Sequence, residues 1–285
     1  MIRLVLSDMD NTLVPLGQRH ASARTVEAIH AVLDAGVRFG PDTGRDYVEL
    51  MRFFSMDESC FMTGIFSNGK RVRADGRYVR TVTFDHDVLV RLDQVLRPHE
   101  GMFLVCYPVD TNLFNPAYGV GVSSRELAEF EGRTSFVGGT VDEVPDIDFV
   151  AAAIACKGGP ERMDLCRRLV AEAVPEVQIV SPIPDWFDVL PHGTSKADGL
   201  QVLLDVLGLA RDEVAVFGDA ENDLAILRSV PYSVAVANAS PQVMATARYR
   251  VGACADEGVA DALFEVARAA RAGEMPDFLK EAAHD

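Results

Sequence analysis

The sequence has few of the features that mark secreted or membrane-spanning proteins. Five cysteines among 285 residues are dispersed and form no Cys-x-x-Cys pair, so neither a disulfide framework nor a zinc site is indicated. The longest apolar run covers residues 149–156, far short of the ~20 residues that span a bilayer. The short apolar start of the chain soon meets Asp8 and Asp10, which is not a signal-peptide pattern. We therefore expect a protein of the reducing cytoplasm.

Basic residues are also scarce. The chain has 27 Lys and Arg residues against 43 Asp and Glu residues, for a formal net charge of −16. It therefore lacks the basic surface with which proteins bind nucleic acids or anionic membranes. A small phosphorylated molecule is still compatible with this charge, because one local site can override the global sign. The length predicts one large domain or two modest ones.

Short apolar runs alternate with amphipathic segments in both end regions of the chain. Expected strands cover residues 2–6, 37–39, 60–65, 186–190 and 214–217, and expected helices cover 22–36, 196–207 and 259–270. Ser22 is the expected N-cap of the first helix, and Gly36 lies at its expected end. Strand–helix–strand alternation predicts an α/β fold with a Rossmann-like parallel sheet as its core.

The middle of the chain breaks this alternation. Asp75-Gly76 lies between two short alternating runs, which is typical of a β-hairpin. From about residue 84 to 184, strands and helices follow in mixed order, including the apolar strand at 149–155. We therefore predict a core of residues 1–82 and 185–285, interrupted by an inserted α+β domain at 83–184.

Two acidic clusters each follow an expected strand directly. Asp8 and Asp10 come after the first strand, and Asp219 and Asp223 come after the strand at 214–217. Each cluster alone is equally well explained as a turn or as an acidic helix start. Together they would meet at the carboxyl edge of one parallel sheet and repel each other without a cation. Oxygen ligands in a partly open site favour Mg²⁺.

Two further segments are candidate phosphate sites. Thr43-Gly44-Arg45 follows the second strand and is expected to open a helix, whose first N–H groups attract anions. Ser195-Lys196 is expected to open another helix. A single lysine is more often a solvated surface residue than a ligand.

These motifs together resemble those of the haloacid dehalogenase-like (HAD) hydrolase superfamily. The resemblance rests on Asp8-Met9-Asp10-Asn11-Thr12-Leu13, Thr43-Gly44-Arg45, Lys196 and Gly218-Asp219-x-x-Asn222-Asp223, in that order. The insert between the second and third motifs is similar to the cap of the Cof-like, type IIB sugar-phosphatase branch. The cap of that branch is an inserted α+β domain of type C2. Asn11 replaces the more usual glycine, and Asp42 stands where a small residue is common.

The resemblance implies a role for each matching residue. Asp8 would be the nucleophile that forms an aspartyl-phosphate, and Asp10 the general acid and base. The implied phosphate ligands are Thr43, Gly44 and Lys196, and the implied Mg²⁺ ligands are Asp8, the Asp10 backbone, Asp219 and Asp223. Asn222 would orient the acidic loop, and Arg45 would either support the site or serve only the start of its helix.

The expected activity is Mg²⁺-dependent hydrolysis of a small phosphate monoester, a sugar phosphate by resemblance, with the cap choosing the leaving group. The expected partner is a small phosphorylated metabolite, with no nucleic acid and no membrane. A phosphomutase acting on a hexose phosphate shares this cap position and these motifs. A non-catalytic sugar-phosphate sensor is a further alternative, although such a sensor would have lost part of the set Asp8, Asp10, Lys196 and Asp219.

Overall fold

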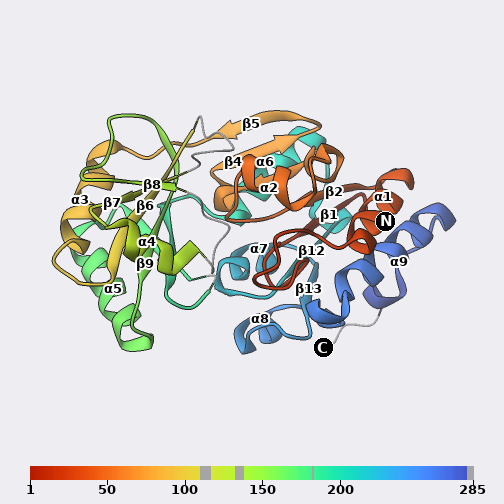
Figure 1. The fold of residues 1–285 in the computed structure, drawn as a ribbon. Helices are drawn as coiled ribbons and strands as arrows, with labels where there is room; N and C mark the ends of the chain where they lie inside the picture. Colours follow the sequence, from red (N-terminus) through yellow and green to blue (C-terminus); the bar gives the residue numbers. More distant parts are fainter. Residues whose placement is uncertain (110–116, 132–137, 182, 281–285) are drawn as a thin grey trace. The chain divides into compact units, whose positions relative to one another are not determined.

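The computed structural model describes residues 1–109, 117–131, 138–181 and 183–280. The chain divides into two compact units. The first consists of Met1–Arg80 and Ser195–Asp285, and the second consists of Thr81–Thr194. Figure 1 shows that the first unit joins the two ends of the chain, because red and blue elements interleave in it.

A five-stranded sheet forms the centre of the first unit. Its strands run in the order β14-β13-β12-β1-β2, and every neighbouring pair is parallel. The strands are β1 (Leu4–Ser7), β2 (Arg38–Pro41), β12 (Val214–Gly218), β13 (Tyr232–Val236) and β14 (Tyr249–Val251). The predicted α/β class with a parallel sheet is therefore confirmed.

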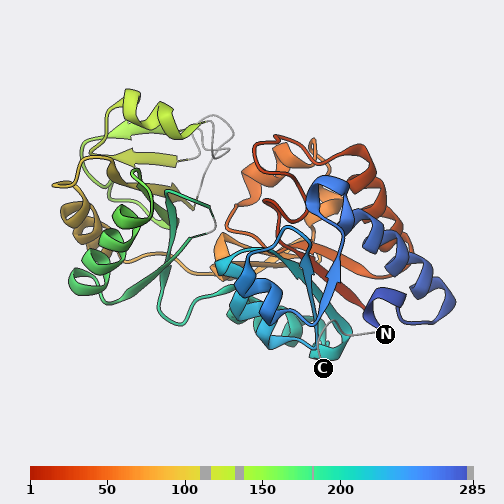
Figure 2. The same ribbon diagram turned by 90° about the horizontal axis from the view of Figure 1, so that it is seen from below.

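Helices cover both faces of this sheet, because side chains along each strand alternate between two apolar clusters. Val5 and Phe217 pack with α1 (Ala23–Asp34) and α9 (Gly258–Ala272), which lie side by side in Figure 2. Leu6 and Val216 point the other way and pack with three further helices. Those helices are α6 (Lys196–Leu207), α7 (Leu224–Ser229) and α8 (Pro241–Thr246). Loops at the carboxyl edge of the sheet are thus held by helices on either side.

The expected third strand is displaced, and it touches the parallel sheet only through an isolated parallel bridge between Ile65 and Asp42, just beyond β2. Residues Glu58–Phe61 form the short 3₁₀ helix η1, and β3 covers only Gly64–Phe66. β3 pairs antiparallel with β4 (Arg71–Ala74), which is followed by β5 (Arg77–Thr81) in a separate three-stranded sheet. The predicted hairpin is confirmed, and its turn residues Asp75 and Gly76 have φ of 46° and 86°.

The second unit is a six-stranded sheet covered by helices. The strand order is β10-β11-β9-β6-β7-β8, and all neighbouring pairs are antiparallel except β7 with β8. The strands are β6 (Met102–Pro108), β7 (Ala117–Val120), β8 (Gly138–Val141), β9 (Phe149–Cys156), β10 (Val177–Val180) and β11 (Trp186–Pro191). The helices are α3 (His86–Leu96), α4 (Ser124–Glu131) and α5 (Pro160–Ala173).

β11 differs from its expected position. The strand at 186–190 was expected to resume the core, but it pairs with β9 and β10 of the second unit. The chain therefore re-enters the first unit at Ser195, ten residues after the expected boundary at 185. The alternation of apolar residues is the same for both sheets, so sequence periodicity could not assign this strand.

Helix starts agree closely with the sequence. Ser22 caps α1 and accepts a hydrogen bond from the Thr25 amide, and Ser195 caps α6 in the same way through Asp198. The remaining helix of the first unit, α2 (Tyr47–Phe53), starts from a capping box on Asp46. Among the described residues, no helix is long and apolar enough to cross a membrane.

Candidate active site

Three acidic side chains meet at the carboxyl edge of the parallel sheet. Asp8 directly follows β1, Asp219 directly follows β12, and these two strands are paired neighbours. Asp223 lies four residues further on, at the end of the 3₁₀ helix η4 (Glu221–Asp223). One oxygen from each of the three carboxylates lies within 4.8 Å of the others, and all three residues are buried. The all-oxygen set fits a hard divalent cation.

Lys196 supplies the positive charge in this cluster. Its side chain is fully buried at the start of α6. Nζ donates hydrogen bonds to Asp8 Oδ1 at 2.8 Å, to Asp223 Oδ1 at 2.5 Å and to the Asp42 backbone carbonyl at 2.6 Å. The solvated-surface interpretation of this lysine is therefore wrong.

The titration behaviour of the site reflects an excess of negative charge. Burial raises the pKa of Asp8 well above its usual range, Lys196 lowers it, and Asp223 raises it again. Burial and Asp223 likewise raise the pKa of Asp219 to about 6. Burial opposes the charge of Lys196, but Asp223, Asp42 and Asp8 outweigh it and raise the lysine's pKa well above its usual value. One lysine does not balance these carboxylates, so a bound cation would be strongly favoured.

Asp10 is held by Arg45. The guanidinium donates to both carboxylate oxygens of Asp10, from Nε at 2.7 Å and from Nη2 at 2.5 Å. A third bond runs from Nη1 to Glu49 Oε1 at 3.0 Å, and the guanidinium lies over the Phe53 ring. Such bidentate pairing fixes the orientation of a carboxylate. Arg45 contacts both the site, through Asp10, and helix α2, through Glu49, so the two roles left open for it both stay predictions.

The Thr43-Gly44-Arg45 segment lies in the expected loop but does not itself open a helix. α2 begins only at Tyr47, after Asp46 and Glu49 have satisfied its first N–H groups. A helix-dipole site for phosphate is therefore not formed here. The Thr43 hydroxyl accepts the Arg45 N–H, and its own proton can still be donated to a ligand.

The sequence pattern shared by a known protein family matches most of this chain. Residues 5–263 match the family of haloacid dehalogenase-like hydrolases. The chain belongs to this family. This confirms the resemblance inferred from the motifs and makes the chain an enzyme of the hydrolase class.

Relatives of this HAD-like hydrolase match along nearly its whole length. The chain is 27% identical over 273 residues to the 5-amino-6-(5-phospho-D-ribitylamino)uracil phosphatase of Escherichia coli, covering 93% of this chain and 96% of the relative. A crystal structure from Streptococcus mutans superposes with a TM-score of 0.80 at 20% identity, covering 92% and 98% of the two chains. A HAD subclass IIB sugar phosphatase superposes with a TM-score of 0.74 at 19% identity, covering 92% and 97%.

The loops of this HAD-like hydrolase are positioned by polar contacts that sequence motifs only partly revealed. Thr12 Oγ1 and Asn11 Nδ2 donate to the two oxygens of Asp219, at 2.8 and 3.0 Å. Asn11 has φ of 61°, a left-handed conformation that glycine adopts freely and that asparagine tolerates. Gly218 is required because a Cβ there would lie 2.7 Å from the Asp223 carboxylate. These contacts orient the acidic residues before any ligand binds.

Asn68 was missed by the sequence analysis. Its Oδ1 accepts a hydrogen bond from Asn222 Nδ2 at 3.4 Å, which joins the η2 turn (Ser67–Gly69) to the acidic loop. The expected orienting role of Asn222 stays a prediction that this contact supports. The only sequence signal for Asn68 was its position after Ser67 in a short polar turn. Such turns are too common to single out a functional residue.

Asp42 is a buried acid beside Lys196. Its side chain has no exposed surface, and neither oxygen has a hydrogen-bond partner among the described residues. Lys196 Nζ lies 3.8 Å from Oδ2. Burial raises the pKa of Asp42 from its usual value of 3.8 to about 7, although Lys196 lowers it. The carboxyl is turned inward, away from solvent.

Asp42→Asn is therefore expected to stabilise the protein more at pH 8 than at pH 5. Between pH 4 and 7 the native carboxyl holds a proton that the unfolded chain has released, so the stability of the wild type falls as the pH rises. Between pH 5 and pH 8 the gain should grow by roughly 3 kcal/mol, because about two pH units lie below the native pKa and each is worth about 1.4 kcal/mol. Urea unfolding in chelator at both pH values measures it, with exposed Asp34→Asn as the control. A gain that does not change with pH would contradict the assignment.

Proposed function

We propose that this HAD-like phosphatase hydrolyses a small phosphate monoester, a phosphorylated sugar or sugar alcohol, with Mg²⁺ and through an aspartyl-phosphate. The observation that carries the proposal is the buried cluster of Asp8, Asp219, Asp223 and Lys196 at the carboxyl edge of the sheet. The substrate class draws on the E. coli relative, named for a phosphoribityl compound, and on the subclass IIB sugar phosphatase. The free, buried cysteines suit the proposed cytoplasmic location.

In the proposed reaction, an oxygen of Asp8 attacks phosphorus in line with the leaving oxygen. The phosphoryl group moves to the Asp8 carboxylate while Asp10 gives its proton to the leaving alkoxide. Asp10 then removes a proton from the water that attacks the aspartyl-phosphate, which releases inorganic phosphate and restores Asp8. Lys196 and the Thr43 hydroxyl hold the phosphoryl oxygens during both steps.

The carboxylates of Asp8, Asp219 and Asp223 and the backbone carbonyl of Asp10 are the proposed ligands of Mg²⁺. When bound, Mg²⁺ would reduce the repulsion between the anionic site and the phosphate dianion. Lys196 Nζ already donates hydrogen bonds to Asp8 and Asp223, so it holds these two carboxylates close to each other. The inserted second unit is the proposed source of contacts that choose the leaving group.

A panel of phosphate esters assayed for inorganic phosphate tests the proposal. Purified protein should release phosphate from one or more sugar phosphates with Mg²⁺, lose this activity in excess chelator and regain it when Mg²⁺ is returned. Ca²⁺ should not restore it, because its larger and looser coordination misplaces the nucleophile. Full activity in chelator would refute the metal dependence. Conversion of a hexose phosphate to its isomer without phosphate release would instead identify a phosphomutase.

Asp10→Asn is expected to lower kcat by roughly 10²–10⁴-fold on sugar phosphates, the usual effect of losing a general acid and base. The loss should be much smaller on p-nitrophenyl phosphate, whose leaving group needs little protonation. Comparing the two substrates in one preparation supplies the control for misfolding. Equal losses on both substrates would argue that Asp10 serves another role.

A further inference from the structure

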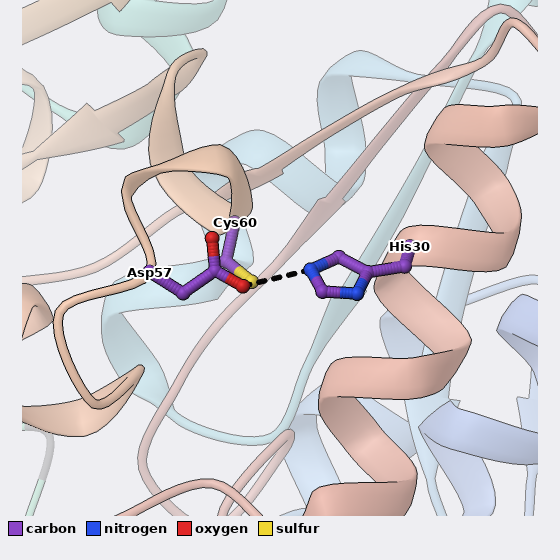
Figure 3. A group of neighbouring side chains, drawn as sticks. All are labelled: His30, Asp57 and Cys60. Carbon is purple, nitrogen blue, oxygen red and sulfur yellow. Dashed lines mark hydrogen bonds and ion pairs between the residues drawn. The ribbon is translucent and has the colours of Figure 1, made fainter.

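A second group of potential metal ligands lies in the first unit, apart from the acidic cluster. His30 projects from α1, while Asp57 and Cys60 come from the start and middle of η1. Figure 3 shows the three side chains pointing toward one another. One ligand atom from each lies within 4.8 Å of the others. α1 leads from the carboxyl end of β1 back to the amino end of β2, and His30 lies in its second half. The group therefore lies toward the amino edge of the sheet, whereas the acidic cluster lies at the carboxyl edge.

Local hydrogen bonds orient the Asp57 carboxylate. Its Oδ1 accepts from the Ser59 amide at 3.1 Å and from the Ser59 hydroxyl at 2.6 Å. Oδ2 is thereby directed at His30 Nε2, 2.7 Å away. The Ser59 hydroxyl also lies 3.3 Å from His30 Nε2. One oxygen caps η1, and the other pairs with His30 Nε2, a contact that a bound cation would replace.

The ligand atoms of this cluster differ in element from those of the acidic cluster. It offers one nitrogen, one oxygen and one sulfur, a mixed set that suits a borderline-soft ion and not Mg²⁺. Ligand atoms around tetrahedral zinc stand about 3.3–3.6 Å apart, given Zn–ligand distances of about 2.0–2.3 Å. The His30 Nε2–Asp57 Oδ2 distance of 2.7 Å would need to open by less than about 1 Å, and Cys60 Sγ lies within 4.8 Å of both atoms.

We propose that His30, Asp57 and Cys60 bind a zinc ion that ties α1 to η1. Nε2, Oδ2 and Sγ are the three protein ligands, and water takes the fourth position. The His30 and Asp57 side chains are 45% and 33% exposed, which gives the ion a path from solvent. The Cys60 thiol gives up its proton to solvent when zinc binds. Three protein ligands predict weaker binding than at a four-ligand structural site.

The competing account is that His30 and Asp57 form an ordinary ion pair and that Cys60 is only a core residue. Cys60 does belong to the apolar cluster beneath α1 and α9. An exposed ion pair contributes little stability and responds to salt, but it does not respond to micromolar zinc. Zinc binding therefore separates the two accounts.

The experiment titrates Zn²⁺ into the full chain in excess Mg²⁺, which would compete for the proposed Mg²⁺ site in the acidic cluster. A competing chromophoric chelator reports affinity, thermal unfolding reports stabilisation, and Co²⁺ in place of Zn²⁺ reports thiolate ligation through its charge-transfer absorption. We expect one bound zinc, a raised Tm and a thiolate–cobalt band. His30→Gln and Cys60→Ala should each weaken binding by at least roughly 10–100-fold, and Cys60→Ala should also abolish that band. His20→Gln, at another exposed histidine of the same unit, should bind like the wild type.

Two results would overturn the proposal. One is zinc affinity that His30→Gln leaves unchanged, and the other is a cobalt complex without a thiolate band. His30→Gln keeps the proposal testable if Cys60→Ala fails to fold, since His30 is half exposed. Phosphate release by His30→Gln should equal that of the wild type with Mg²⁺ present. Failure of the zinc site would thus leave the phosphatase proposal intact.

Discussion

Asp8→Asn is expected to abolish phosphate release while leaving the fold intact, with kcat lower by at least roughly 10⁴-fold. An amide cannot attack phosphorus to form the acyl phosphate, and it binds a hard cation poorly. The residue is buried, and the amide has nearly the shape of the carboxylate. Burial and the neighbouring acids Asp223 and Asp219 already disfavour the charge of Asp8. The Tm in chelator should therefore not fall.

The matched control is Asp93→Asn in the second unit. Asp93 is also a buried carboxylate and accepts two hydrogen bonds from Arg97, so this variant likewise loses a buried charge. It should keep wild-type turnover at a modest cost in stability. A comparable loss of turnover in both variants, or substantial turnover in Asp8→Asn, would remove Asp8 from the nucleophile's role.

Lys196→Met is expected to damage both activity and stability. Methionine fills similar volume but leaves Asp8, Asp42 and Asp223 buried without their shared counter-charge. Removing one partner of a buried ion pair costs about 3–5 kcal/mol. The loss in chelator should be larger at pH 8 than at pH 5, because the carboxyls can take up protons at the lower pH. Loss of a positioned cation should lower kcat by roughly 10²–10³-fold or more.

Urea unfolding and phosphate release measure the two effects, with Lys280→Met as the control. Lys280 is 49% exposed and pairs with Asp277 at the surface, so its loss should cost less than about 1 kcal/mol. An equally mild effect at Lys196 would mean that the buried charges are compensated in another way. Restored stability in saturating Mg²⁺ would support the excess negative charge as the cause.

The sequence by itself predicted the features that depend on local chemistry. The helix starts at Ser22 and Ser195, the hairpin at Asp75-Gly76 and the parallel character of the main sheet follow from short-range patterns. The sequence also predicted that the two acidic pairs lie close together. Residues that follow adjacent parallel strands meet at one edge of the sheet, however the remaining chain packs. The motif order was sufficient to identify the family.

Only the tertiary structure decided which distant residues become neighbours. Periodicity could not assign β11 to the second sheet or exclude β3 from the first, because any half-buried strand shows the same alternation. It could not show that Arg45 holds Asp10, that Asp42 is buried beside Lys196, or that His30 meets Cys60. Each of these contacts joins separate elements, and their side chains meet only when the whole core closes. Their burial and their ion pairing are therefore properties of the packed structure and not of any one segment.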